Sequence, residues 1–367
     1  MSSVELSYID RKLLPSDSIL HIVTALNGIF LGSMTLWSSS SRAADNGFSR
    51  LDAQRIDSMS DGIVFFNGSY VSASTANVSI FDRAFSAGDG IYDVARSFGH
   101  RANKLYEHCE RFCRSATYTR IAVPYTARQL EDISRQVLTK NLASVDRMDD
   151  RIVWLIATRG IDPPTRNPMD ATAPTVMIYT LPVHYHRFAK FYHSGAHLIT
   201  AVTRRTPPEC LDPRAKITNK LNHIQAEFEV RSVDRDAFPL MLATDGSVAE
   251  ASASNVFFVK GGRVFTPRSK NILLGIMRQN VIDMAPEANI EIVEGDFYPY
   301  DFLLADEIFL TTTSFSILPI SRFNGKLLGT VPGPVTARLI AAWSKEIGID
   351  FVAQASMLSS RSLNAEI

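Results

Sequence analysis

Two lysines four residues apart are the first candidates for chemistry in this sequence. The stretch "DPRAKITNKLNHIQAEF", residues 212–228, places Lys216 in a proline-punctuated loop and Lys220 where a helical pattern begins. A lysine attacks a carbonyl only as the free amine, and burial beside other cations favours that form. Most lysines are solvated surface charges, so these residues alone leave both interpretations open.

Histidines and cysteines cluster at two places where a metal could bind. His108, Cys109 and Cys113 lie in a helical pattern that offers no fourth ligand, and an irregular segment carries His184, His186 and His193. Because structural metal sites need a complete ligand set, we expect no metal at either place. The three cysteines, including Cys210, cannot all pair with one another, which favours a reducing compartment such as the cytoplasm.

The composition is that of an ordinary globular protein. Of 367 residues, 46% are apolar and 21% are charged, and 38 lysines and arginines balance 38 aspartates and glutamates. This balance provides no basic field to hold a nucleic acid or an anionic membrane, so we expect neither partner. At about 100 to 200 residues per domain, the length predicts two domains or three.

The first sixty residues predict no clear fold. Residues 18–37 are apolar over about the length of a membrane span, but His21, Asn27 and two glycines interrupt them, so we expect no membrane anchor. Acids at positions 5, 10 and 17 argue against a transit peptide. Because Met59 precedes the first convincing strand, we interpret residues 1–58 as an N-terminal extension or as upstream sequence absent from the native protein.

Regular patterns begin at about residue 61. "IVFFNGSYV" predicts a β-hairpin, because Asn67-Gly68 tolerates the positive φ values of a tight turn. A helix is predicted where Leu105, Cys109, Phe112 and Ala116 recur at helical spacing, and "ARQLEDISRQVLTKNLA" predicts a second. With the β-rich runs "RIVWLIATRG" and "TVMIYTLPV", these elements predict a small α+β domain over residues 61–180.

A larger α/β domain is expected over residues 196–355, after a linker at 181–195 and before a tail at 356–367. Strand-like runs such as "FPLMLATDG" and "NVFFVKGG" alternate there with helical runs. In the helical run 219–232, Leu221, Ile224 and Phe228 share one face, so Lys220 falls in the first turn. A cation in that turn is mildly unfavourable against the helix dipole.

Seven stretches in order resemble one enzyme family. They are "DRAFSAGDGIYDVARSF", "YEHCERFCRSA", "DPRAKITNKLN", "DGSVAEASASNVFFVKGGRVFTP", "LLGIMRQNVIDMA", "ADEIFLTTTSFSILPI" and "VPGPVTARL". Together they resemble the class IV aminotransferases of fold type IV, which use pyridoxal 5′-phosphate. The resemblance covers about residues 62–345 and implies the α/β fold of that family.

The resemblance assigns the two central chemical roles. Lys216 matches the lysine that forms a Schiff base with the cofactor aldehyde and then moves a proton between the substrate α-carbon and the cofactor. Glu250, in "VAEASASN", matches the acid that keeps the pyridine nitrogen protonated, although without the match it reads as an exposed strand-end glutamate. Lys220 stands where many relatives carry a tyrosine, which makes it the weaker candidate nucleophile.

Phosphate binding is implied at four positions. Arg111 matches an arginine whose planar fork suits a dianion, and Thr313 matches a hydroxyl donor. Ile276 and Met277 would offer backbone amides at a helix N-terminus after Gly275. The alternatives are a surface ion pair for Arg111 and strand packing for Thr313.

Substrate binding is implied less specifically. Tyr92 matches an aromatic residue near the substrate, and Arg96 and Arg166 are candidates for holding its carboxylate, although Arg166 could be a solvated loop charge. Ala84, Asp93 and Ala251 depart from the usual family residues without removing a catalytic group. Tyr92-Asp93-Val94 and "VTRRTPPECLDP" look closer to the D-amino-acid and (R)-amine branches than to the branched-chain L-amino-acid branch.

The resemblance therefore predicts a ping-pong transaminase. It would move an amino group from an amino acid, D- or branched-chain, or a primary amine to a 2-oxo acid, and it would assemble as a homodimer. An aminodeoxychorismate lyase-like enzyme of the same fold and a catalytically silent cofactor-binding or scaffolding protein are the alternatives.

Overall fold

The predicted hairpin opens the described chain. The computed structural model describes residues 62–143, 145–171 and 173–364, so the predictions for residues 1–58 lie outside the described residues. Strands β1 (Ile63–Phe66) and β2 (Ser69–Ser72) pair antiparallel around Asn67-Gly68. Both turn residues have positive φ, at 46° and 93°, which confirms the predicted turn and its reason.

The first lobe is built on an antiparallel sheet of six strands in the order β2-β1-β6-β5-β3-β4. Its remaining strands are β3 (Gly90–Phe98), β4 (Arg101–Asn103), β5 (Arg151–Thr158) and β6 (Thr175–Pro182). Helix α4 (Leu105–Thr119) buries the four apolar residues whose spacing predicted it, and α5 (Ala127–Leu142) packs beside it. A capping box between Thr126 and Gln129 begins α5. Short elements α3 (Arg83–Ala87), η1 (Ala73–Thr75) and η2 (Pro168–Asp170) lie in the connections.

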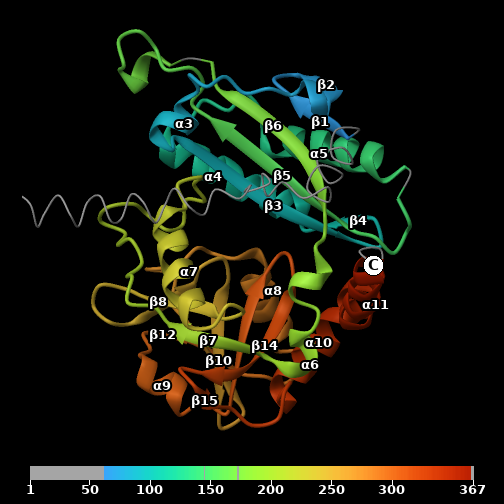
Figure 1. Ribbon diagram of the computed structural model, residues 1–367, viewed down its shortest axis with the longest axis vertical. Helices are drawn as coiled ribbons and strands as arrows, with labels where there is room; N and C mark the ends of the chain where they lie inside the picture. The colour runs from blue at the N-terminus through green and yellow to red at the C-terminus, as the bar shows by residue number, and fades with distance from the viewer. Residues whose placement is uncertain (1–61, 144, 172, 365–367) are drawn as a thin grey trace, which may run out of the picture. The chain divides into compact units, whose positions relative to one another are not determined.

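The second lobe holds a mixed sheet of nine strands (Figure 1). The strand order is β12-β11-β10-β13-β14-β7-β8-β9, with β15 paired to β14. Pairs β11–β12, β14–β7 and β7–β8 are parallel and the other pairs antiparallel. The bounds are β7 (Ala196–Thr200), β8 (Phe238–Leu242), β9 (Val248–Ala251), β10 (Asn255–Lys260), β11 (Arg263–Pro267), β12 (Ile292–Gly295), β13 (Glu307–Thr312), β14 (Ser316–Phe323) and β15 (Lys326–Leu327).

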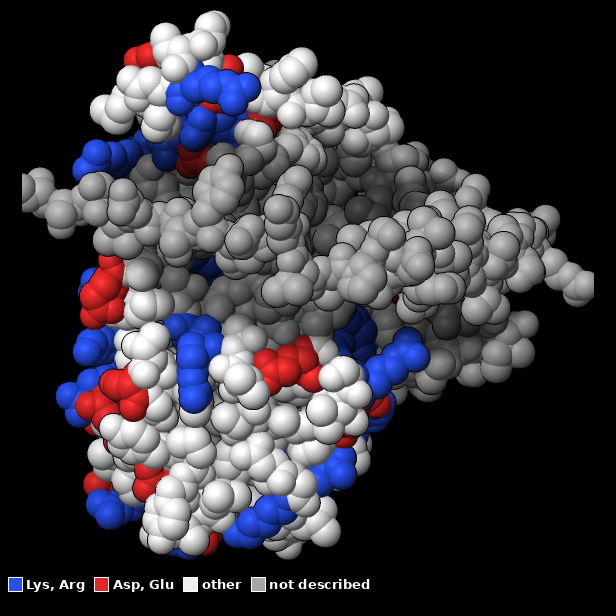
Figure 2. Space-filling view, turned by 60° about the vertical axis from the view of Figure 1, so that its left-hand side comes forward, with Lys and Arg blue, Asp and Glu red and all other residues white. Residues whose placement is uncertain are grey.

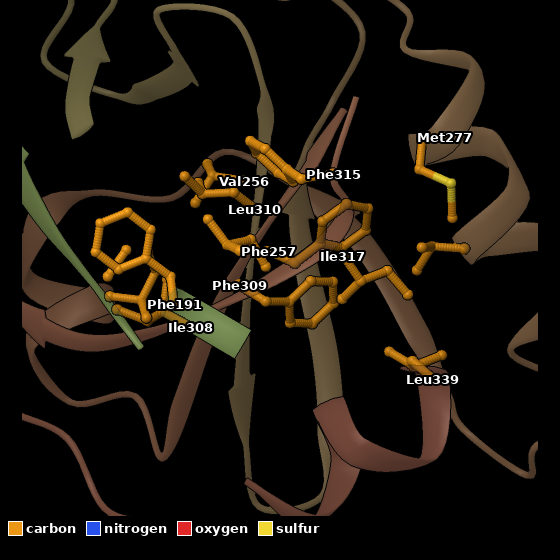
Figure 3. Packing of buried hydrophobic residues seen from close by; sticks show 14 of the residues in the cluster. Phe191, Val256, Phe257, Met277, Ile308, Phe309, Leu310, Phe315, Ile317 and Leu339 are labelled. Carbon is orange, nitrogen blue, oxygen red and sulfur yellow. The ribbon is translucent and has the colours of Figure 1, made fainter. Parts of the chain in front are cut away.

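The core of the second lobe forms around its central strands β10, β13 and β14 (Figure 3). Phe257 and Phe309 stack with ring centroids 4.8 Å apart. Met277 of α8 (Ile276–Met284) and Leu339 of α10 (Pro334–Ile347) belong to the same cluster. These strands are buried on both faces, which explains why their sequence is continuously apolar rather than alternating.

The segment predicted as a linker joins the two sheets. It contains η3 (Tyr185–Arg187) and α6 (Phe191–Ser194), and its aromatic residues Phe188, Phe191 and Tyr192 are buried in the core of the second lobe. The described residues all fall within one compact unit, and helix α11 (Phe351–Asn364) continues through the boundary predicted at 355. The domain boundaries therefore remain a prediction.

Helix α7 (Leu221–Val233) presents its predicted apolar face outward. Leu221, Ile224 and Phe228 are 61%, 42% and 70% exposed, whereas His223, Ala226 and Val230 are buried. Small Ala226 lets the helix approach β8 closely, so the packed face is less apolar than the outer one. Helical spacing identified the stripe correctly but not the side on which the sheet lies.

Charges of both signs share the surface. On the face in Figure 2, lysine and arginine side chains lie among aspartates and glutamates, without a field of one sign.

The helices of the described residues include the short α9 (Pro299–Leu303). Within residues 62–143, 145–171 and 173–364, no helix has both the length and the apolar character to cross a bilayer.

Candidate active site

A cavity of about 240 Å³ brings together seven of the nine residues predicted for the site. The first lobe supplies Tyr92 from β3 and Arg111 from α4. The chain between β7 and α7 supplies Lys216, and the second lobe supplies Glu250, Ile276, Met277 and Thr313. Arg96 and Arg166 do not line this cavity.

The backbone of Lys216 is fixed by the first lobe. Its carbonyl accepts a hydrogen bond from the Tyr92 amide at 3.0 Å, and its amide donates to Ser115 Oγ at 2.9 Å. Its Nζ lies 4.5 Å from the centroid of the Tyr92 ring, which itself stacks on Trp154. Burial, and then Arg111, lower the pKa of Lys216 to about 8. The deprotonated fraction near neutral pH is therefore much larger than for an ordinary lysine, and this is the form that a nucleophile or proton carrier requires.

Glu250 is a buried carboxylate held in its charged form. Oε1 accepts from Arg205 Nε at 2.9 Å, and Oε2 accepts from the Leu273 amide at 2.9 Å, while His223 Nε2 lies 3.9 Å from Oε1. Burial alone would raise the pKa of Glu250, but His223, Arg205 and the Leu273 amide together lower it to about 2. An ionised acid in a cavity can stabilise a proton on a ring nitrogen.

Arg111 is oriented by a buried acid. Its Nε and Nη2 donate to the two oxygens of Asp93 at 2.8 and 2.7 Å, and its Nη1 donates to the Leu274 carbonyl at 2.9 Å. His108 Nδ1 shares Asp93 Oδ1 at 2.7 Å. Burial would raise the pKa of Asp93, but Arg111 and His108 hold it well below its usual range. This bidentate pairing fixes the guanidinium at the edge of the cavity.

Helix α8 begins at the cavity, and its N-cap Gly275 supplies no side-chain cap for the first backbone amides. Ile276 and Met277 are its first residues, and no acidic side chain lies in its first turn. A Cβ on Gly275 would stand 2.0 Å from Asn255 Oδ1, so any larger residue there would have to displace the Asn255 side chain. Thr313 lies beside this turn, and the buried Thr311 hydroxyl has no hydrogen-bond partner among the described residues. Convergent donors of this kind suit a phosphate group.

Arg96 and Arg166 lie elsewhere. Arg96 is 1% exposed, donates to the Ser314 carbonyl and stacks 4.4 Å from the Phe98 ring centroid. It borders a separate small cavity that shares Ile276, Met277 and Thr313 with the first. Arg166 is exposed in the loop between β5 and β6, with a φ of 55°.

The sequence analysis did not predict the roles of four residues around the site. Arg205 and His223 surround Glu250, and Asp93 and His108 orient Arg111. His108 and Arg111 are three residues apart on one helix, a spacing that places both on the same face and could have linked them. No local signal connects Arg205 with Glu250, which are 45 positions apart.

The profile of the family described as Amino-transferase class IV matches residues 90–323, which contain every residue that lines the cavity. The chain belongs to the class IV aminotransferases. A Methanocaldococcus jannaschii protein assigned as a branched-chain-amino-acid aminotransferase is 30% identical over 278 residues, 75% of this chain and 93% of that protein. The D-alanine aminotransferase of Bacillus licheniformis is 29% identical over 286 residues, 77% of this chain and 96% of that protein.

Solved structures of this aminotransferase family have the same fold. A T.th. branched-chain amino acid aminotransferase, complexed with N-(5′-phosphopyridoxyl)-L-glutamate, superposes with a TM-score of 0.71 at 26% identity, over 78% of this chain and 95% of that one. The aminotransferase therefore has fold type IV and uses pyridoxal 5′-phosphate, which confirms the predicted fold class, family and cofactor. Transamination is favoured over the lyase and the silent protein.

The residues present fit this cofactor. The cavity holds one group for each part of the cofactor. The Lys216 amine suits its aldehyde, the Glu250 carboxylate suits its ring nitrogen, and the start of α8 suits its phosphate group. The unpartnered Thr311 hydroxyl is one buried donor that a bound group could satisfy.

Proposed function

We propose that this aminotransferase acts on amino acids and 2-oxo acids, with Lys216 as the catalytic residue. The half-buried Lys216 amine, with its pKa lowered to about 8, carries this proposal. Lys216 would hold the cofactor through its amine, and the same amine would then carry a proton to or from the substrate α-carbon. The cofactor supplies a ring that accepts the electrons released when that proton leaves.

The other residues of the cavity hold the cofactor. Glu250 binds the pyridine nitrogen, because its carboxylate stays ionised and Arg205 fixes its direction. Arg111, Thr313 and the amides of Ile276 and Met277 bind the phosphate group. Tyr92 covers the reactive amine from the side of the first lobe.

The amino donor is proposed to be a branched-chain or a D-amino acid. Relatives with each of these names align over similar lengths at 30% and 29% identity, so neither is preferred on similarity. Holoenzyme should be mixed with D-alanine, L-leucine and (R)-1-phenylethylamine while the cofactor absorbance is followed. Bleaching of the cofactor band by an amino acid, with turnover that needs a 2-oxo acid, supports transamination. Pyruvate release without an acceptor would instead indicate a lyase.

A homodimer is proposed from exposed apolar side chains. Ile80, Phe81 and Phe85 are 77%, 68% and 69% exposed near the loop that carries Arg166, and the outer face of α7 adds a second apolar stripe. Contiguous exposed apolar surface usually marks an interface. Arg166 does not line the cavity of its own chain, and we propose that it serves the cavity of the partner subunit.

A cytoplasmic location is also proposed. All three cysteines are free thiols, which suits a reducing compartment.

A further inference from the structure

The charged side chains that line the cavity are mostly paired. Arg205 pairs with Glu250, and Asp212 pairs with Arg214 outside the cavity. Arg111 is balanced by Asp93 behind it. These pairs leave the two lysines as the charges of the cavity that need a partner.

Within the described part of the chain, neither Lys216 nor Lys220 has a carboxylate within ion-pair distance. Lys216 lies over the Tyr92 ring, and Lys220 Nζ donates to the Ser252 carbonyl at 3.4 Å. The Tyr92 hydroxyl also interacts with the Lys220 side chain. An ammonium has three donors, so these two contacts leave Lys220 able to bind one further acceptor. Burial lowers the pKa of Lys220, and an anion beside it would reverse that effect.

The electrostatics around Lys220 favour an anion. Lys220 is the N-cap of α7, whose first turn carries no acidic residue and whose N-terminus is capped by no side chain. Asn222 and His223 of this turn, and Asn219 just before the N-cap, also line the cavity, so the positive end of the helix dipole faces it. Besides the cofactor phosphate, an amino acid substrate brings one more anion, its carboxylate.

The arginines expected to hold this carboxylate are not available in the cavity of this chain. Arg96 is buried against Ser314 and Phe98. Arg166 is exposed in the loop between β5 and β6. Once Lys216 is bound to the cofactor and Arg111 faces the phosphate group, Lys220 is the remaining cation without an acidic partner among the described residues that line the cavity.

We propose that the ammonium of Lys220 binds the carboxylate of the substrate and so selects amino acids and 2-oxo acids over simple amines. This inference rests on the proposed function, because it assigns a substrate contact within the same cavity. It concerns binding and orientation, and the bond-making steps remain with Lys216.

The test compares Lys220→Gln, Lys220→Arg and the control Lys345→Gln, whose lysine is exposed on α10. Binding of 4-methylpentanoate to each holoenzyme is measured by titration calorimetry. Loss of a charge-assisted hydrogen bond should raise the dissociation constant about 10- to 100-fold in Lys220→Gln. Lys220→Arg should stay within about threefold of the parent protein because it keeps the charge, and Lys345→Gln should be unchanged.

A second readout separates substrate binding from other roles. The amino acid concentration that half-saturates cofactor bleaching should rise in Lys220→Gln by the same factor, with a smaller change in the limiting rate. An unchanged carboxylate dissociation constant in Lys220→Gln overturns the inference, as does a parent holoenzyme that binds no carboxylate. A shift only in the pH dependence of cofactor absorbance overturns it too, because Lys220 would then serve the cofactor ring.

The outcome also separates this inference from the proposed function. If no amino acid bleaches the cofactor of the parent protein, the proposed function fails. If amino acids bleach the parent cofactor but Lys220→Gln responds at the same concentrations, only the role of Lys220 fails. Thermal unfolding and the cofactor spectrum of each variant verify that the protein is folded and loaded.

Discussion

Arg205 and Glu250, which are 45 residues apart in the sequence, form a buried ion pair of 2.9 Å in the active-site cavity. The Arg205 guanidinium donates a hydrogen bond to one oxygen of Glu250, and the Leu273 amide donates to the other. Both interactions favour the carboxylate form, so the acid keeps its charge although it is buried. The pair thus fixes the charge and the direction of the group assigned to the ring nitrogen.

Replacing Glu250 by glutamine should impair chemistry more than folding. The amide keeps the shape and an acceptor for Arg205 but cannot hold a proton on the ring nitrogen, so the rate of cofactor bleaching should fall about 100-fold or more. Rapid-mixing absorbance of the loaded variant measures that rate. Glu291→Gln, at an exposed pair with Arg263, is the matched control and should react like the parent protein. Equal bleaching rates for Glu250→Gln and the parent would remove Glu250 from the mechanism.

Replacing Asp93 by asparagine should weaken cofactor binding. Arg111 loses the carboxylate that orients it, so its contribution to phosphate binding should fall and the cofactor dissociation constant should rise about 10-fold or more. Fluorescence titration of the apoprotein with pyridoxal 5′-phosphate measures this constant. Asp306→Asn, which removes an exposed pair with Lys260, serves as the control. An unaltered constant in Asp93→Asn would mean that Arg111 does not need Asp93 to bind phosphate.

Covalent attachment of the cofactor to the apoprotein should follow the titration of Lys216. Burial and Arg111 lower its pKa from 10.5 to about 8, and only the deprotonated amine reacts. The attachment rate should therefore rise as the pH increases and reach half of its maximum near pH 8. Stopped-flow absorbance between pH 6 and about 10.5 checks this profile. A midpoint near the ordinary lysine value would show that the amine is not perturbed.

The outer face of α7 should contribute to the proposed subunit interface. Phe228 is 70% exposed, and a glutamate there would put a charge into an apolar contact. Phe228→Glu should weaken self-association at least about tenfold, as measured by analytical ultracentrifugation. Tyr300→Glu, at a 68% exposed residue on α9, is the control. If both variants dimerise as tightly as the parent protein, the interface lies elsewhere.

Local features of the fold could be predicted from the sequence. The Asn67-Gly68 hairpin depends on two adjacent residues, and α4 depends on a spacing within one helix, so each is encoded over a few positions. The start of α8 after Gly275 was instead implied by the family resemblance.

Features that depend on packing could not be predicted. An apolar stripe on α7 does not reveal whether the sheet or solvent lies beside it, and here small Ala226 faces the sheet. Arg96 follows Tyr92 on the same face of β3, yet it binds Ser314 rather than entering the cavity. Pairing of Arg205 with Glu250 arises only when the chain before α7 meets β9.

The most direct test of the account is the location of the covalent cofactor link. Borohydride reduction of the holoenzyme followed by peptide mapping should place one pyridoxyl group on Lys216. A pyridoxyl group on Lys220, or on no residue of the peptide that contains both lysines, would contradict the assignment of the catalytic amine.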